Sequence, residues 1–72
     1  MKTAPLVTML NQIADNFAPY PREEAVAAIA DHVTKFWEKR MRAALAAHLA
    51  DGSDGLSELA RAAAARVAAP HG

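Results

Sequence analysis

The sequence predicts an all-α fold, a small bundle of three to four short helices. Apolar residues recur at helical spacing in several segments, and no segment alternates with period two for long enough to form a strand. In addition, 19 of the 72 residues are alanine, which favours helix. A chain of this length makes one domain. We therefore expect residues 1–72 to form a single helical domain with frayed ends at 1–4 and 69–72.

The first helix is expected over residues 5–17. Pro5 suits a first helical turn, where its missing N–H costs nothing. The larger apolar residues of this segment form one stripe: Leu6, Met9, Leu10, Ile13 and Phe17. Pro19 and Pro21 then stop the helix, because neither fits a helix interior.

The next two helices are expected over residues 21–37 and 39–50. Pro21 can occupy a first turn, and the dipole favours the acids Glu23 and Glu24 behind it. The inner face of the first of these helices reads Val26, Ile29, Ala30, Val33, Phe36 and Trp37. A second apolar set lies about 90° around the same helical wheel: Met41, Ala44, Leu45, His48 and Leu49. This change of direction predicts a break near residues 37–39, and a long curved helix is the alternative.

The last helix is expected over residues 57–68, after a loop at 51–55. Gly52 can close the preceding helix in a left-handed conformation, and Ser57 is the expected N-cap with Glu58 behind it. The inner stripe is rich in alanine: Leu56, Leu59, Ala60, Ala63, Ala64 and Val67.

Composition narrows the function. Only 19 apolar residues are larger than alanine, so the core is small, and the chain has no cysteine for a disulfide or thiolate metal site. No apolar run is long enough to span a bilayer. Eight basic and eight acidic residues give no overall pull toward nucleic acid. We expect a cytoplasmic interaction module or small subunit with no catalytic, cofactor or metal site.

Residues 35–42 are the most informative stretch, because they hold the single tryptophan and four basic residues beside one acid. Tryptophan, arginine and methionine together are typical of interface hot spots. The alternative is that the aromatic residues are core and the charges solvated. The candidate partner-binding residues are Phe36, Trp37, Arg40, Met41, Arg42 and His48.

The chain resembles the delta subunit of cytoplasmic, NAD-dependent, molybdenum or tungsten formate dehydrogenases. Three blocks carry the resemblance, which covers about residues 6–67. They are residues 6–13 with Phe17, residues 22–42, and residues 48–49 with 55–57 and the closing helix. The most specific part is Phe36-Trp37-Glu38-Lys39-Arg40-Met41-Arg42. The family often has proline where Lys39 and Glu58 stand, and both are expected first-turn positions.

The resemblance implies a non-catalytic subunit of an enzyme that oxidises formate to carbon dioxide. Its alpha subunit would carry bis-molybdopterin guanine dinucleotide and iron–sulfur clusters. Its beta and gamma subunits would carry flavin mononucleotide and further clusters, and pass electrons to NAD. The small subunit would bind the alpha subunit and support assembly, cofactor insertion or stability of the complex.

Two other functions compete with this one. A small helical DNA-binding module could use the basic residues 35–42 to contact phosphates, although a neutral chain is unusual for such a domain. A homo-oligomeric helical bundle with a structural role is the second alternative.

Overall fold

The computed structural model describes residues 4–52 and 54–68, and every regular element in these residues is a helix. The helices are α1 (Ala4–Phe17), α2 (Arg22–Phe36), α3 (Lys39–Ala50) and α4 (Glu58–Ala68). Each expected helix is confirmed, with its ends within one residue of the prediction. Of the expected frayed ends, Ala4 begins α1, whereas residues 1–3 and 69–72 lie outside the described residues.

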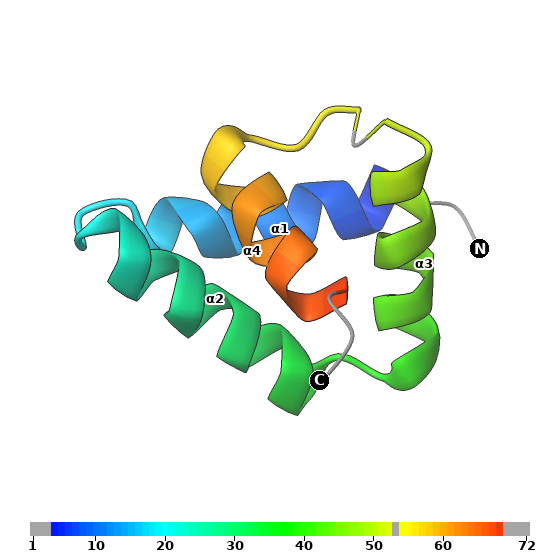
Figure 1. Cartoon of the computed structure of the whole chain (residues 1–72), viewed down its shortest axis with the longest axis horizontal. Coiled ribbons are helices and arrows are strands. Elements are labelled where there is room, and N and C mark those ends of the chain that lie inside the picture. The colour runs from blue at the N-terminus through cyan, green and yellow to red at the C-terminus, as the bar shows by residue number, and fades with distance from the viewer. Residues whose placement is uncertain (1–3, 53, 69–72) are drawn as a thin grey trace.

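Helix α4 lies at the centre of the arrangement and contacts each of the other three helices (Figure 1). Its most extensive contact is with α2. Helices α2 and α3 make little contact with each other, although only two residues join them. The bundle is therefore held together mainly by packing onto α4, which contacts α2, α3 and α1.

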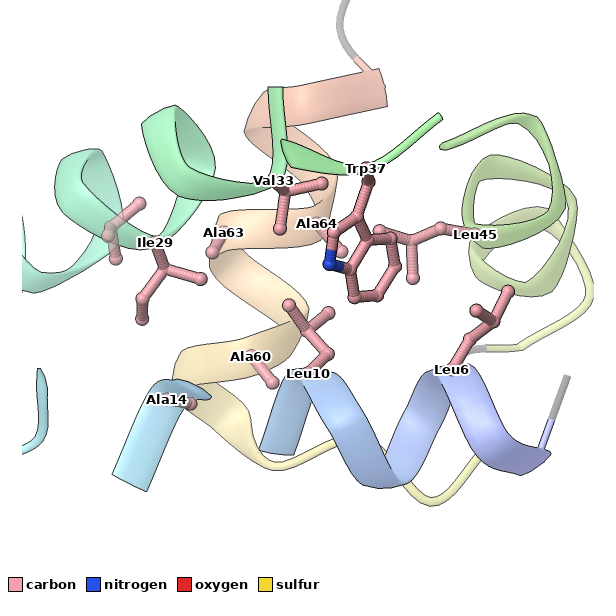
Figure 2. Close-up of a cluster of buried hydrophobic side chains, with 11 residues drawn as sticks. Leu6, Leu10, Ala14, Ile29, Val33, Trp37, Leu45, Ala60, Ala63 and Ala64 are labelled. Carbon is pink, nitrogen blue, oxygen red and sulfur yellow. The ribbon is translucent and has the colours of Figure 1, made fainter. Parts of the chain in front are cut away.

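The core draws on all four helices and on the α2–α3 junction (Figure 2). Its largest fully buried side chains are Leu10, Ile29, Leu45 and Val33. Helix α4 contributes only alanines to the fully buried set, namely Ala60, Ala63 and Ala64. Because alanine has a short side chain, α4 can approach its neighbours closely, which suits its central position.

The predicted break between α2 and α3 is confirmed, and it begins at Trp37, the C-cap residue of α2. Trp37 leaves the helix with extended backbone angles (φ −88°, ψ 136°), while its N–H donates to the carbonyl of Val33 at 2.9 Å. Glu38 is also extended (φ −64°, ψ 155°) and is the N-cap residue of α3. The indole of Trp37 points into the core between α2 and α3 (Figure 2).

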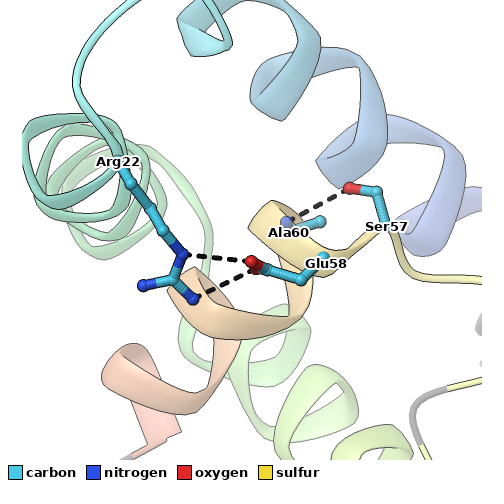
Figure 3. Close-up of polar contacts among 4 residues, drawn as sticks. All are labelled: Arg22, Ser57, Glu58 and Ala60. Carbon is cyan, nitrogen blue, oxygen red and sulfur yellow. Dashed lines mark hydrogen bonds and ion pairs between the residues drawn. The ribbon is translucent and has the colours of Figure 1, made fainter.

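The starts of α2 and α4 were assigned one residue too early, and that of α1 one residue too late. Pro21, expected in the first turn of α2, instead precedes the helix as its N-cap residue with an extended ψ of 142°. Ser57 is the N-cap of α4, and its Oγ accepts a hydrogen bond from the N–H of Ala60 at 3.2 Å (Figure 3). The capping role predicted for Ser57 is therefore confirmed.

The loop between α3 and α4 is tied to α1 by one amide side chain. Asn11 Nδ2 donates to the Gly55 carbonyl, and Asn11 Oδ1 accepts from the Ser57 N–H, both at 2.9 Å. Gly52 and Gly55 have φ of 118° and 85°, which confirms the positive φ expected for Gly52. A Cβ on Gly55 would also stand 3.3 Å from Val7 Cγ1, a tight contact that would require the Val7 side chain to shift.

Candidate partner-docking surface

The six predicted partner-binding residues do not share one exposed surface. Phe36 is 72% exposed, and Arg40 is exposed as well. Met41, Arg42 and His48 are half-buried. Trp37 is only 5% exposed and belongs to the core. A partner can therefore reach Phe36 and Arg40 directly, whereas most of the indole serves the chain's own fold.

Phe36 was expected on the inner face of α2, and the structure corrects that expectation. Phe36 is the last residue of α2, so the extended turn at Trp37 carries the indole inward and leaves the phenyl ring outside. The ring contacts the imidazole of His32 one helical turn earlier, with 4.8 Å between centroids and 41° between planes. One face of an aromatic side chain is thus left open at the surface.

Phe36 lines a groove of about 390 Å³ between α1 and the α2–α3 junction. We call this the apolar groove, and it is lined by Met9, Gln12, Ile13, Asn16, His32, Phe36, Trp37 and Met41. It brings together three of the six predicted residues, Phe36, Trp37 and Met41. Arg40, Arg42 and His48 are not part of its lining.

Helix α1 supplies the half of the groove that sequence reasoning missed. Met9 was assigned to the inner stripe of α1, yet it is 40% exposed because Leu6, Leu10 and Ala14 form the buried line. Met9 and Met41 therefore flank the groove from two helices. Flexible thioethers adapt to varied apolar surfaces, and methionine is enriched at interfaces. The sequence signal for this position is that Met9 does not fit the four-residue spacing of Leu6, Leu10 and Ala14, which places it beside the buried line.

His48 has a structural contact that accounts for its half-buried position. Its Nε2 lies 2.6 Å from the carbonyl oxygen of Asp54, so the imidazole N–H can donate to the α3–α4 loop. Together with Asn11, this side chain fixes the loop that leads into α4.

The basic residues near the groove differ in how they are partnered. Lys35 pairs with Asp31 one turn earlier at 3.0 Å. Within the described ranges, Lys39 and Arg40 form no ion pair, and the first turn of α3 holds no acid. Arg42 Nε is buried and has no hydrogen-bond partner. Trp37 and Met41 both line the groove. The two exposed cations Lys39 and Arg40 lie between these two residues in the sequence.

A second groove of similar size lies between α2 and α4, lined by Ala27, Ala30, Asp31, Thr34, Arg66 and Val67. Its polar groups on α2 are already engaged. Asp31 pairs with Lys35, and the Thr34 hydroxyl donates to the carbonyl of Ala30 at 2.8 Å. The apolar groove, with its exposed phenyl ring, is the stronger candidate for a binding surface.

The described residues contain no group of three or more histidine, aspartate or glutamate residues that could hold a metal ion. Among those same residues, no helix is long and apolar enough to cross a membrane. The resolved pKa shifts belong to one exposed pair, in which the hydrogen bond from Arg22 lowers the pKa of Glu58.

Comparison with known protein families identifies the family of this chain. Residues 5–64 match the family model of the NADH-dependent formate dehydrogenase delta subunit FdsD. No curated protein and no solved structure matches the chain. The match covers α1 from its second residue, all of α2 and α3, the groove between them, and the first part of α4.

Proposed function

Because the chain belongs to the family of the NADH-dependent formate dehydrogenase delta subunit, we propose that it is a non-catalytic accessory subunit of that enzyme. It binds the catalytic alpha subunit in a cytoplasmic complex with beta and gamma subunits. Those subunits carry the molybdopterin, iron–sulfur and flavin centres and use NAD. The delta chain supports assembly, cofactor insertion or stability of the complex.

The observation that carries this proposal is the apolar groove with its exposed phenyl ring. Phe36 is 72% exposed and Met9 40% exposed, and both line the groove with half-buried Ile13 and Met41. A partner that covered these side chains would remove apolar surface from water. This burial favours binding by a free energy of about 25 cal/mol for each Å² of apolar surface. Exposed apolar groups gathered in a groove, with polar Gln12 and Asn16 at its edge, fit a protein interface.

The polar side chains with known contacts serve the fold, which agrees with an accessory role. Asn11 and His48 hold the α3–α4 loop, Ser57 caps α4, and Arg22 joins α2 to α4 through Glu58. Their geometry explains helix ends and loop positions, and none of them lines the apolar groove.

The DNA-binding alternative is less well supported by the same geometry. Lys35 is paired with Asp31, and Phe36 and Met41 interrupt the basic stretch with apolar surface. The chain as a whole is neutral. A salt-dependent complex between the purified chain and random duplex DNA would favour this alternative.

Co-purification from a strain that expresses all four subunits tests the binding site. A tagged chain should retain the alpha subunit, and Phe36→Ser with Met9→Ser should reduce the retained amount at least tenfold. Tyr20→Ser is the matched control, because Tyr20 is a 55% exposed aromatic outside the groove. Unchanged retention by the Phe36–Met9 variant would reject the groove as the docking site.

The assembly role is tested separately. We expect omission of the delta chain to lower the yield of alpha subunit that contains molybdenum or tungsten and molybdopterin, measured by metal analysis after purification. The groove variants should lower it to the same extent, whereas Tyr20→Ser should not. Full cofactor content without the delta chain would contradict a role in assembly and leave only the binding claim.

A further inference from the structure

We propose that the apolar groove, together with Lys39 and Arg40 between its lining residues Trp37 and Met41 in the chain, receives a partner segment in which a large apolar side chain is next to a carboxylate. This inference rests on the proposed function, since it gives the chemistry of the alpha-subunit segment that docks. The apolar side chain would lie between Met9, Phe36 and Met41, and the carboxylate would face Lys39 and Arg40.

The apolar half of the inference follows from the groove lining. Four apolar side chains with exposed or half-exposed surface meet there from α1, the end of α2 and the start of α3: Met9, Ile13, Phe36 and Met41. Two of the four are methionines, whose unbranched side chains can adjust around an inserted group. Among the described residues, Phe36 has a ring contact with His32 alone and is 72% exposed, so most of its surface is available to a partner.

The charged half follows from the imbalance of charge at the start of α3. The chain is neutral overall, yet Lys39 and Arg40 are exposed and form no ion pair among the described residues. Glu38 is the single acid between Phe36 and Arg42. Its side chain makes no capping hydrogen bond to α3.

The helix itself adds to the same sign of potential. The N-terminal end of a helix carries partial positive charge, which acids in the first turn usually offset. Glu23 and Glu24 do so in α2, and Glu58 does so in α4. The first turns of α1 and α3 have no acid, and Glu38 precedes α3 as its N-cap residue. Lys39 and Arg40 outnumber Glu38 at the start of α3, so an acidic partner group is favoured there and a basic one is disfavoured.

An apolar groove together with two exposed cations favours a protein segment over a polyanion such as nucleic acid. Phosphates of nucleic acid would satisfy the cations but would leave Met9 and Phe36 uncovered. A short segment that pairs an apolar anchor with a carboxylate satisfies both halves, and arginine can bind the carboxylate with two parallel hydrogen bonds.

The test places a photo-crosslinker in the groove of the full chain within the co-expressed complex. Phe36→p-benzoylphenylalanine keeps an aromatic ring at an exposed position, and mass spectrometry identifies the crosslinked peptide. We expect an alpha-subunit peptide with an aspartate or glutamate within about one helical turn of a large apolar residue. A crosslinked peptide without acids, or with lysine or arginine there, would overturn the inference.

Charge reversal gives an independent readout. Lys39→Glu with Arg40→Glu should weaken binding of the alpha subunit at least tenfold at low salt, and by less at 0.5 M NaCl. Arg61→Glu is the control, because Arg61 is an exposed cation outside the groove. An unchanged affinity after reversal at 39 and 40 would overturn the inference and leave the proposed function standing.

The two proposals fail in different ways. If the acidic, apolar peptide belongs to the beta or gamma subunit, the inference stands and the alpha-subunit assignment falls. If random duplex DNA or anionic phospholipid vesicles protect position 36 from crosslinking as well as the alpha subunit does, the groove is not selective for a protein segment and the inference is rejected.

Discussion

At the scale of single residues, Phe36 and Trp37 show what sequence reasoning could not resolve. Both are large and aromatic, and both lie within the inner sector of a helical wheel extended to residue 37. The helix ends between them, so the wheel no longer applies to Trp37, and one ring is buried while the other is exposed. Their assignment required the backbone angles of a single residue.

Arg42 gives a residue-scale prediction. Its Nε is buried without a hydrogen-bond partner, which costs about 1–3 kcal/mol of stability. Lysine places a methylene group where that nitrogen stands and keeps the charge. Arg42→Lys should therefore raise the free energy of unfolding by about 1 kcal/mol in urea denaturation. Arg40→Lys, at an exposed position, should change it by less than about 0.5 kcal/mol, and equal effects of the two changes would contradict this explanation.

At the scale of helices, periodicity predicted the bundle well because each helix buries a distinct stripe. The break between α2 and α3 followed from the change in stripe direction alone, without a proline to mark it. The loop before α4 was a different case. Asn11 and His48 hold it across distances of 44 and 6 residues in the sequence, and no local pattern announces such hydrogen bonds.

The α2–α3 junction predicts the effect of proline at position 39. Lys39 is the first residue of α3, so its N–H has no acceptor within the helix. Glu38 already has the extended angles that a following proline requires. Lys39→Pro should therefore stabilise the chain by about 0.4–1 kcal/mol, because it restricts the unfolded state.

The control for that change lies three residues further on. The N–H of Arg42 donates to the Glu38 carbonyl at 3.0 Å, so proline there removes a helical hydrogen bond. Arg42→Pro should destabilise the chain by about 3 kcal/mol in the same urea titration. Similar losses from proline at 39 and at 42 would mean that α3 does not start at Lys39 in solution.

At the scale of the whole molecule, the pH dependence of stability should be shallow. The ion pair between α2 and α4 joins Arg22 Nε to Glu58 Oε1 at 3.0 Å, with both side chains about 60% exposed (Figure 3). The hydrogen bond from Arg22 lowers the pKa of Glu58 below its ordinary value of 4.5. The stabilisation is present above that ordinary pKa and is lost as the pH falls through the lowered pKa of the folded chain.

Glu58→Gln should therefore flatten the decline of stability below about pH 4.5, measured by urea denaturation at several pH values. High salt should shrink the difference, because exposed pairs are screened. Glu24→Gln, a change at an exposed acid without an ion pair among the described residues, is the control. If the free energy of unfolding of Glu58→Gln declined at low pH as it does in the original chain, the pair would not stabilise the fold.

The small core links stability to binding. Among the residues that the structure describes, six of the 13 buried core residues are alanine. An isolated domain of this size buries only about 60% of its unfolded surface. A partner that binds only the folded chain adds RT ln(1 + [L]/Kd), about 2.7 kcal/mol at a concentration of 100 times Kd. Binding of the alpha subunit would then bury the apolar side chains that remain exposed in the groove.

Hydrogen exchange of the isotope-labelled chain measures this linkage directly. Core amides of α2 and α4 that exchange by global unfolding should slow about 100-fold when the alpha subunit is present at 100 times Kd. Phe36→Ser should leave exchange of the free chain almost unchanged, since the ring is 72% exposed, but should abolish most of the slowing. Equal slowing in the variant and the original chain would place the docking surface elsewhere, even if the alpha subunit binds.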